Sequence, residues 1–497
     1  MKNIAIIDIG SNSIRIIIYK IFHNNAFKAI VTEKYPSKLG NLLDNNGNLS
    51  SSGINLTINI LKIFKNICKI NNVSDIYVIA TEAIRKAKNN REFLPIIEDK
   101  TGLKIKVLSG FEEAFLGYLS VKSTLNIENA LIVDIGGSSM EISLMKNKEI
   151  KAFISLPLGA IPLTKNFNFY ENISHTQKKN LKNFLFENFN KISWLKEGLN
   201  FPLIGVSSTP RTIGKIYKKD TNYPLDITHN FKVSSKTIES MYENISSLTL
   251  DEKLQVKGLS KEKADIFTAS LGAIYYLMDY CNSKELIISE FGIKEGLLFK
   301  ILNKRNEEKI TPLEFSLNNI MNLNGLNKDH RDKIFNLSKY IYKKLDHNFF
   351  NNKILYTCSS LLDLGFSISL ENVYKHSFYM ILNSNLYGLS PKEILMCAYT
   401  VALSKKEDFK LKSKYKEILL DDDIILCKKL STILNLAKKI NTLEDNSSYN
   451  ISVEIYENTV YITLPTNLSS NTFIKETIEN NINLNFNKYF NKNISII

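Results

Sequence analysis

The sequence predicts an α/β protein with two similar lobes, followed by a helical region and a small α/β module. Three observations lead to this fold class. β-rich runs alternate with helical runs in the first third, an Asp-Ile-Gly segment occurs twice, and the apolar pattern becomes helical after residue 312. We divide the chain accordingly into lobe I (1–125), lobe II (126–305), a helical domain (312–440) and a terminal module (441–497).

The first lobe is expected to contain a largely parallel or mixed sheet. Apolar residues recur with the helical period between residues 53 and 71, as at Ile54, Ile58 and Leu61. The other elements follow from β-rich runs and the turns that bound them. Strands are expected at 3–9, 14–21, 75–80 and 104–108, and a second helix from Phe111 onward.

An internal repeat links the first two lobes. The segment IDIGSNSIRI at 7–16 matches VDIGGSSMEI at 133–142. Each copy predicts a strand, a tight turn and a second strand. Repetition on the scale of a domain indicates two similar lobes that face each other rather than a solenoid, which has a short period. A chance match is the alternative.

A charged segment at 303–314, which contains Pro312, predicts the boundary at which the C-terminal part begins. Helical periodicity then extends to about residue 440. Two alternating runs, 452–456 and 459–463, flank Glu457-Asn458 and predict a β-hairpin.

Length and composition restrict the class of protein. A chain of 497 residues suits about three or four domains. The net charge of +14 favours anionic partners, unless the lysines are simply spread over solvated faces. The five cysteines are scattered without a CxxC pair, which indicates a reducing compartment. No signal peptide or membrane span is evident, so we expect a cytoplasmic protein without a membrane partner.

The two Asp-Ile-Gly turns are the first candidates for chemistry. Glycine lets a backbone approach a ligand closely, and serine hydroxyls add donors for phosphate oxygens. Asp8 and Asp134 end their strands and could hold Mg²⁺, a cation that prefers oxygen ligands and keeps part of its water. One such turn would be an ordinary loop, but two predict a phosphate site between the lobes.

The segment from Ser109 to Ala114 begins a helix. Ser109 and Glu112 have the spacing of a capping box. Phe111, Phe115 and Leu119 are expected to form the buried stripe, which leaves Glu113 on another face, where it could reach a cleft. The alternative is a solvated glutamate near the start of a helix.

Two further segments follow β-like runs. Arg85 stands where a strand gives way to a helix, and its guanidinium could bind phosphate or pair with Glu82 at the surface. The run GVSSTPRT at 205–212 could hold phosphate or simply start a helix at Pro210.

The order of these motifs resembles the exopolyphosphatase / guanosine pentaphosphate phosphatase family (Ppx/GppA). The matching segments are DIGSNS, ATEAIR, SGFEEA, DIGGSSME, SLPLGA, GVSSTPRT and SEFGIKEGLL, across residues 4–300. The resemblance implies actin-like lobes of the sugar-kinase and Hsp70 superfamily, followed by a helical HD-like domain. It also implies the hydrolysis of a terminal phosphoanhydride.

The resemblance implies roles residue by residue. Glu113 would be the catalytic glutamate that orients or deprotonates water, and Arg85 would contact the terminal phosphates. Asp8, Asp134 and Glu141 would bind Mg²⁺ or another divalent cation. The remaining phosphate-binding residues would be Ser11, Asn12, Ser13, Gly136, Gly137, Ser138, Ser139, Ser208 and Thr209.

The sequence also departs from the family's pattern. Ser138 and Ser208 stand where the family usually has glycine, and Met140 where it has threonine. A side chain at a position of close approach would crowd the phosphate or require another backbone angle. The HD pattern keeps His330 but reads Leu362-Asp363 and Ser404-Lys405 at its later positions, so we predict no HD metal site.

These observations predict an exopolyphosphatase that releases orthophosphate from inorganic polyphosphate. Guanosine pentaphosphate (pppGpp) is the alternative substrate, and no specific nucleic acid is expected. A homodimer is left open. The rival functions are an ATP-dependent kinase of the same superfamily and a binder of polyphosphate or guanosine tetra- or pentaphosphate with impaired catalysis.

Overall fold

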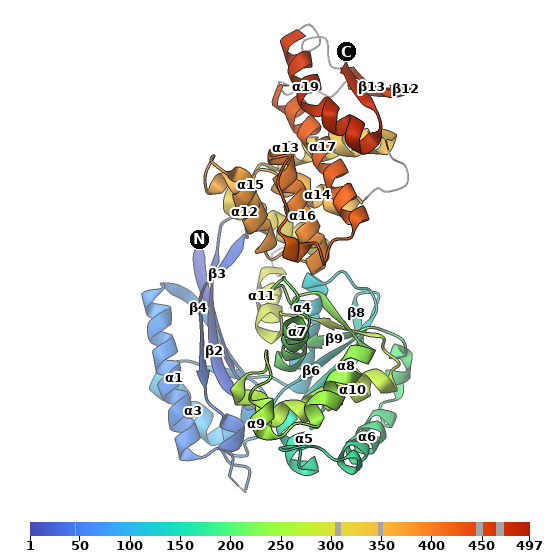
Figure 1. The fold of residues 1–497 in the computed structure, drawn as a ribbon. Coiled ribbons are helices and arrows are strands. Elements are labelled where there is room, and N and C mark those ends of the chain that lie inside the picture. Colours follow the sequence, from blue (N-terminus) through green and yellow to red (C-terminus); the bar gives the residue numbers. More distant parts are fainter. Residues whose placement is uncertain (45, 304–309, 346–350, 444–450, 464–471) are drawn as a thin grey trace. The chain divides into compact units, whose positions relative to one another are not determined.

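The structure is a computed structural model that describes residues 1–44, 46–303, 310–345, 351–443, 451–463 and 472–497. The chain forms two compact units, unit 1 (Met1–Leu313) and unit 2 (Glu314–Ile497). Unit 1 contains two mixed β-sheets with helices packed against them (Figure 1).

The first sheet has the strand order β3-β2-β1-β4-β5. β1 and β2 form a hairpin, β3 extends it antiparallel, and β4 and β5 run parallel to β1. Helices α1 and α3 pack against this sheet over an isoleucine-rich core. The elements are β1 (Lys2–Ile9), β2 (Ser13–Ile21), β3 (Phe27–Pro36), α1 (Ser51–Ile70), β4 (Val73–Ala80), α2 (Glu82–Lys86), α3 (Asn90–Thr101) and β5 (Ile105–Val107).

The second sheet has the order β10-β11-β9-β6-β7-β8. Its β6–β7–β8 meander, followed by the parallel strands β9 and β11, repeats the plan of the first sheet. The predicted repeat is thus confirmed as two sheets of like topology. The strands are β6 (Ala130–Ile135), β7 (Met140–Lys146), β8 (Glu149–Leu156), β9 (Leu203–Val206), β10 (Phe231–Ser234) and β11 (Glu285–Ile288).

Helices around the second sheet build the larger core of unit 1, and α10 lies at its centre. They are α5 (Ala160–Phe167), α6 (His175–Asn190), α7 (Ser208–Asp220), α8 (Ser235–Ser246), α9 (Leu250–Lys253) and α10 (Ala264–Tyr280). Helix α11 (Ile293–Asn303) instead packs against the helix at Gly110–Thr124 and contacts β1.

Helix α4 (Gly110–Thr124) follows β5 in the chain but packs against the second sheet, on β6, β7 and β8. The predicted capping box is present, with Ser109 and Glu112 bonded to each other's backbone N–H groups. The predicted buried stripe is wrong: Phe111 is 47% exposed, and Phe115 and Leu119 are only half-buried. The opposite face is buried instead, and it carries Glu113, which is therefore not a solvated glutamate.

Unit 2 is mainly helical and ends in a three-stranded sheet of order β12-β13-β14. The predicted hairpin is confirmed, with Tyr456 opposite Thr459. Among the described residues, no helix is both long and apolar enough to cross a bilayer. The elements are α12 (Pro312–Asn324), α13 (Lys328–Leu345), α14 (Asn352–Leu361), α15 (Val373–Leu382), α16 (Pro391–Lys405), α17 (Asp421–Leu443), β12 (Ser452–Tyr456), β13 (Thr459–Thr463), α19 (Thr472–Phe490) and β14 (Asn493–Ile496).

His229 joins the end of α4 to the turn after β11. Its Nε2 lies 3.2 Å from the carbonyl oxygen of Thr124, and its Nδ1 accepts from the N–H of Glu290 at 3.4 Å. The ring also packs on Phe291. These partners suit the neutral imidazole with its proton on Nε2. Burial lowers the pKa of His229 to about 4, from an ordinary value of 6.5.

This burial predicts a loss of stability in acid. The unfolded chain protonates His229 below pH 6.5 and the folded chain only near pH 4, so stability falls as the pH falls between these values. The loss from this group approaches about 3 kcal/mol. We expect His229→Gln to flatten the pH dependence of the unfolding midpoint between pH 6.5 and 4.5. The exposed His175 supplies the control, His175→Gln, whose pH dependence should match wild type. Equal slopes for all three proteins would contradict the assignment.

Candidate active site

A cleft lies between the two sheets of unit 1, at the carboxyl ends of their parallel strands, a usual place for ligands in α/β proteins. Its lining comes from the turns after β1, β4, β6, β9 and β11 and from the start of α4. Twelve predicted site residues line it: Asp8, Ser11, Asn12, Ser13, Glu113, Asp134, Gly136, Gly137, Ser138, Ser139, Glu141 and Ser208.

The two Asp-Ile-Gly turns have the same hydrogen bond and meet across the cleft. The N–H of Gly10 donates to Ser13 at 3.1 Å, and that of Gly136 donates to Ser139 at 2.9 Å. The hydroxyls of Ser11 and Ser138 lie 3.4 Å apart.

The carbonyl oxygens of both turns are held by the segments that follow. Ser37 and Gly40 donate to Asn12 and Ser11, and Ala160 and Ile161 donate to Gly136 and Gly137 (2.8–3.1 Å). The turns are thereby left to present N–H groups, an arrangement that binds phosphate.

Gly159 lets the segment that precedes α5 pack closely against the second turn. A Cβ atom at this position would overlap the backbone of Ser138 and Ser139. The segment SLPLGA can pass under the turn only because it has glycine there.

The strand register places a charged pair at the base of each turn. Asp8 lies opposite Arg15 in the first hairpin, and Asp134 lies opposite Glu141 in the second. Burial raises the pKa of Asp8, Asp134 and Glu141, and the neighbouring Asp134 raises that of Glu141 further. The Ser155 hydroxyl donates to Glu141 at 2.7 Å. The second hairpin therefore carries two carboxylates at the position where the first carries a carboxylate and a guanidinium.

Glu113 is 5% exposed and faces the same cleft. Burial raises its pKa, and the nearby Glu141 adds to the effect. Arg85 donates from one nitrogen both to Glu113 and to the Leu108 carbonyl, at 2.6 Å each, and pairs with Glu82 through the other.

Arg85 is therefore placed differently from the expectation. It pairs with Glu82, as its alternative interpretation held, but it is not a lone surface pair, because Glu113 shares the guanidinium. Arg85 is not part of the described cleft lining, and its terminal nitrogens donate to these two carboxylates. Its position is that of a residue that orients Glu113.

Thr209 also departs from the expectation. Its hydroxyl donates to Ser270 on α10 at 3.2 Å, and its side chain is buried in α7. Ser208 lines the cleft at the start of the same helix. The residue with unusual backbone is neither Ser208 nor Ser138 but Ser207, whose φ is 78°.

The sequence interpretation missed a group of cations at one side of the cleft. Arg15, Arg211 and Lys294 line it, and Lys263 lies near Arg211, Arg15, Lys34 and Lys215. Burial and these cations lower the pKa of Lys263 to about 8. The sequence could have indicated Arg15 and Arg211, because they stand within the motifs at 7–16 and 205–212. It gave no such indication for Lys263, which is distant from both motifs in sequence.

The donor set suits a divalent cation. The carboxylates gathered in this poorly solvated cleft are only partly compensated by nearby cations, and carboxylate oxygens are ligands that Mg²⁺ accepts. Among the described residues, no three His, Cys, Asp or Glu side chains gather closely enough to hold a metal by themselves. Water and substrate oxygens would therefore complete the coordination, as is common for Mg²⁺.

Unit 2 brings the residues of the HD pattern together around Asp363. His330 lies 3.3 Å from this carboxylate, and Lys405 and Lys438 lie at 2.9 and 2.5 Å. The hydrogen bonds and positive charges hold the pKa of Asp363 well below its usual range. Two ammonium groups thus neutralise a carboxylate that would be a metal ligand in a complete HD site. The absence of an HD metal stays a prediction.

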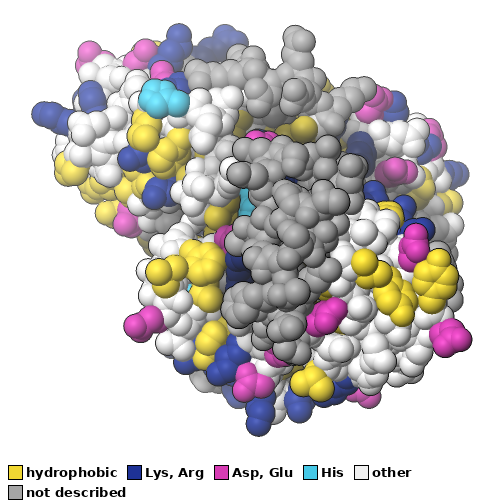
Figure 2. Space-filling view, turned by 90° about the horizontal axis from the view of Figure 1, so that it is seen from above, with side chains coloured by type: hydrophobic (Ala, Val, Ile, Leu, Met, Phe, Trp, Pro, Cys, Tyr) yellow, Lys and Arg dark blue, Asp and Glu magenta, His cyan; other side chains and the backbone are white. Residues whose placement is uncertain are grey.

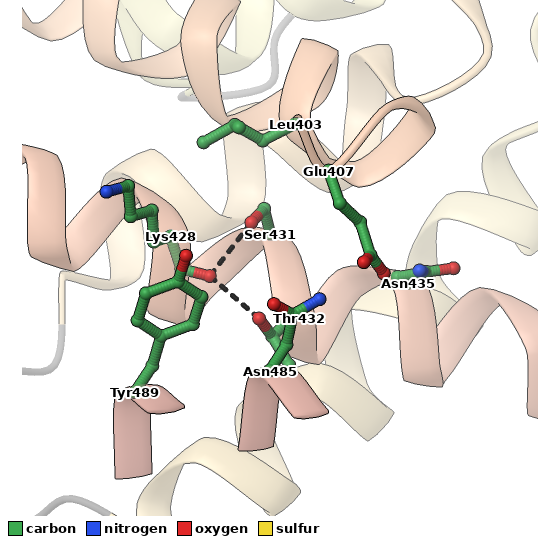
Figure 3. A pocket seen from close by; sticks show the side chains of 8 residues that line it. All are labelled: Leu403, Glu407, Lys428, Ser431, Thr432, Asn435, Asn485 and Tyr489. Atoms are coloured by element: carbon green, nitrogen blue, oxygen red, sulfur yellow. Dashed lines mark hydrogen bonds between the residues drawn. The ribbon is translucent and has the colours of Figure 1, made fainter. Parts of the chain in front are cut away.

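A second hollow lies within unit 2, where α16, α17 and α19 meet (Figure 3). The hydroxyls of Ser431 and Thr432 fold back onto the Lys428 carbonyl of their own helix, at 2.8 and 2.9 Å. The Lys428 ammonium lies over the Tyr489 ring. The hollow lies where these helices meet the terminal module, and the two hydroxyls are already bonded to the backbone of their own helix.

Comparison with known proteins gives the chain two family matches. The model of the Ppx/GppA phosphatase family matches residues 17–305, and that of Ppx/GppA phosphatase domain III matches residues 314–496. Among solved structures, the Aquifex aeolicus family member is 26% identical with a TM-score of 0.56, over 62% of this chain and 99% of that one. An exopolyphosphatase from Cytophaga hutchinsonii, 21% identical with a TM-score of 0.57, covers 61% of this chain and 99% of its own and shares the fold.

Two relatives with named activities are also similar. A guanosine-5'-triphosphate,3'-diphosphate pyrophosphatase from Aeromonas hydrophila is 23% identical over 83% of this chain and 82% of its own length. A bifunctional 3-dehydroquinate synthase/phosphatase from Fusobacterium nucleatum is 30% identical over 58% of this chain, but the match spans only 44% of that protein. The fold neighbours confirm the predicted fold class of the lobes, and the two family matches span most of the sequence: the chain belongs to the Ppx/GppA phosphatase family.

Proposed function

We propose that unit 1 is an exopolyphosphatase, which hydrolyses the terminal phosphoanhydride of inorganic polyphosphate and releases orthophosphate. The observation that carries the proposal is Glu113, a buried carboxyl group that Arg85 holds in the same cleft as the two facing turns. A carboxylate of this kind is suited to accept a proton from water, and the turns are suited to hold the phosphate.

In the proposed reaction, the N–H and hydroxyl groups of both turns bind the terminal phosphate. Water attacks its phosphorus, the bond to the bridging oxygen breaks, and the proton from water passes to Glu113. Arg85 holds Glu113 at 2.6 Å and so fixes the direction of its free oxygen. Asp8, Asp134 and Glu141 would hold a divalent cation, which supplies neutralisation of charge on the leaving polyphosphate.

The choice of polyphosphate rests on charge. Arg15, Arg211 and Lys263 place cations beside the turns, where the next phosphates of a chain would lie. On the face that Figure 2 shows, Lys and Arg side chains are interspersed with Asp and Glu, so the +14 surplus is partly dispersed there. The alternative substrate is pppGpp, the class named for the Aeromonas relative, because both substrates end in the same phosphoanhydride.

Two rival functions make different demands on the cleft. A kinase needs a second substrate as acceptor, whereas the proposed reaction uses water, with Glu113 as proton acceptor. A binder with impaired catalysis would need Ser138 and Ser208 to block hydrolysis, but neither residue has a positive φ. Both observations favour a hydrolase.

The role of Glu113 is tested against its neighbour. We expect Glu113→Gln to lower turnover by roughly 10²–10⁴-fold with little change in KM, because it removes the proton acceptor. Glu112→Gln is the matched control, since glutamine still fits a capping box and this side chain pairs with Lys106 at the surface. Phosphate release by purified full-length protein measures both. An equal loss in the two variants would contradict the assignment.

Substrate class is tested by measuring phosphate release from long polyphosphate, pppGpp and ATP side by side at several salt concentrations. If the cations form a track, the affinity for the long polyanion falls steeply with salt through counterion release, and that for the nucleotide falls less. We expect the highest kcat/KM with polyphosphate. A higher value with pppGpp and equal salt slopes would select the nucleotide phosphohydrolase. Turnover of ATP only with a second acceptor would select the kinase.

Ser138→Gly separates enzyme from binder. Ser138 does not have a positive φ, and its hydroxyl lies 3.4 Å from the hydroxyl of Ser11. We therefore expect active wild-type protein and a change of less than about tenfold with glycine. A wild type that is inert on every phosphate substrate, together with an active glycine variant, would reject the enzyme in favour of the binder.

A further inference from the structure

Ser207 adopts a backbone conformation that side chains rarely occupy. Its φ is 78° and its ψ is −164°, a region that belongs almost entirely to glycine. Most other residues with positive φ are asparagines with φ near 50–64°, which fall in the left-handed helical region that asparagine tolerates. Ser207 therefore stores backbone strain at the point where β9 ends and α7 begins, on the wall of the cleft.

The side chain of Ser207 joins two loops of the cleft. Its hydroxyl donates to the Ile135 carbonyl at 3.2 Å, directly after Asp134 at the end of β6. Strands β6 and β9 run parallel, with Asp134 opposite Val206, so the serine stands beside the carboxylate.

The backbone of Ser207 anchors a cation of the same cleft. Arg211 donates from Nε to the Ser207 carbonyl at 2.6 Å and from a terminal nitrogen to the Glu290 carbonyl at 2.9 Å. The orientation of this carbonyl depends on the φ and ψ of Ser207. The conformation of Ser207 thus directs its hydroxyl to the strand end that carries Asp134 and its carbonyl to Arg211.

We propose that Ser207 is a positioning residue for hydrolysis, retained in a glycine-like conformation because its hydroxyl ties the third loop to the strand end that carries Asp134. The inference rests on the proposed function of the cleft. Folding alone would favour glycine here, since glycine adopts this conformation without strain. The serine therefore lowers stability and, on this proposal, contributes to activity.

Two substitutions separate strain from hydrogen bonding. Ser207→Gly removes both the Cβ atom and the hydroxyl, whereas Ser207→Ala keeps the strain and removes only the hydroxyl. We expect Tm to rise by roughly 2–4 °C in the glycine variant and not to rise in the alanine variant. We expect kcat for tripolyphosphate with Mg²⁺ to fall about tenfold in both, with KM changed less than about threefold.

Asn222→Gly is the control. Asn222 also has a positive φ, but it is exposed and lies just past the other end of α7. Its variant should keep full activity with little change in Tm. A residue with only a structural role would not give a higher Tm together with a lower kcat. A glycine variant at 207 that keeps full activity, or that loses stability, overturns the inference.

Failure of the proposed function gives a different pattern. If the wild type releases no phosphate, the proposed function fails. The role of Ser207 is then tested by measuring how much Mg²⁺ and tripolyphosphate raise the Tm of the wild type and of both Ser207 variants. A smaller rise in both Ser207 variants than in wild type supports positioning of the ligand. An equal rise, or none in the wild type, overturns it.

Discussion

The cleft of unit 1 is built around carboxyl groups that the protein largely buries. Asp8, Asp134, Glu141 and Glu113 all face it, and burial raises the pKa of each. Carboxylates in this situation are costly to ionise unless positive charge or hydrogen bonds compensate them. The surrounding structure provides this compensation in part, through Arg85 for Glu113 and through the hydroxyls of Ser155 and Ser207 for the second lobe. What remains is the charge that a cation and a phosphate substrate would balance together.

The two lobes share a plan but differ in charge. The residue that faces the aspartate across each hairpin is Arg15 in the first and Glu141 in the second. A repeat of one scaffold thus places unlike residues at matching positions of the cleft, and Arg211 and Lys294 add cations from the second lobe. The cleft therefore carries cationic groups suited to a polyanion and carboxylates suited to its counter-cation.

The sequence predicted those features that depend on local chemistry. Repeated turns, the capping box at Ser109 and the terminal hairpin have short signatures, and the structure confirms them. The buried face of α4 was mispredicted because an apolar stripe at 111, 115 and 119 outweighed a face with Glu113 and Gly117, and only the packing against the second sheet decides between them. Arg85 and Ser207 depend on contacts between segments distant in sequence, so their motifs gave the correct loop but not the correct partner.

Unit 2 keeps part of the HD pattern in a different charge environment. His330 and Asp363 still meet, yet Lys405 and Lys438 occupy the coordination space of the carboxylate and lie over the Phe366 ring. A half-buried carboxylate stripped of these partners would be destabilising. The lysines therefore belong to the scaffold of this unit.

The path of α4 has a mechanical consequence. This helix is packed on the second sheet, while the arginine that grips its Glu113 comes from α2 on the first. The carboxylate and its holder are therefore carried by opposite halves of unit 1. A rotation of one half against the other would change the distance between these two side chains, so this ion pair couples the position of Glu113 to the relative placement of the two sheets.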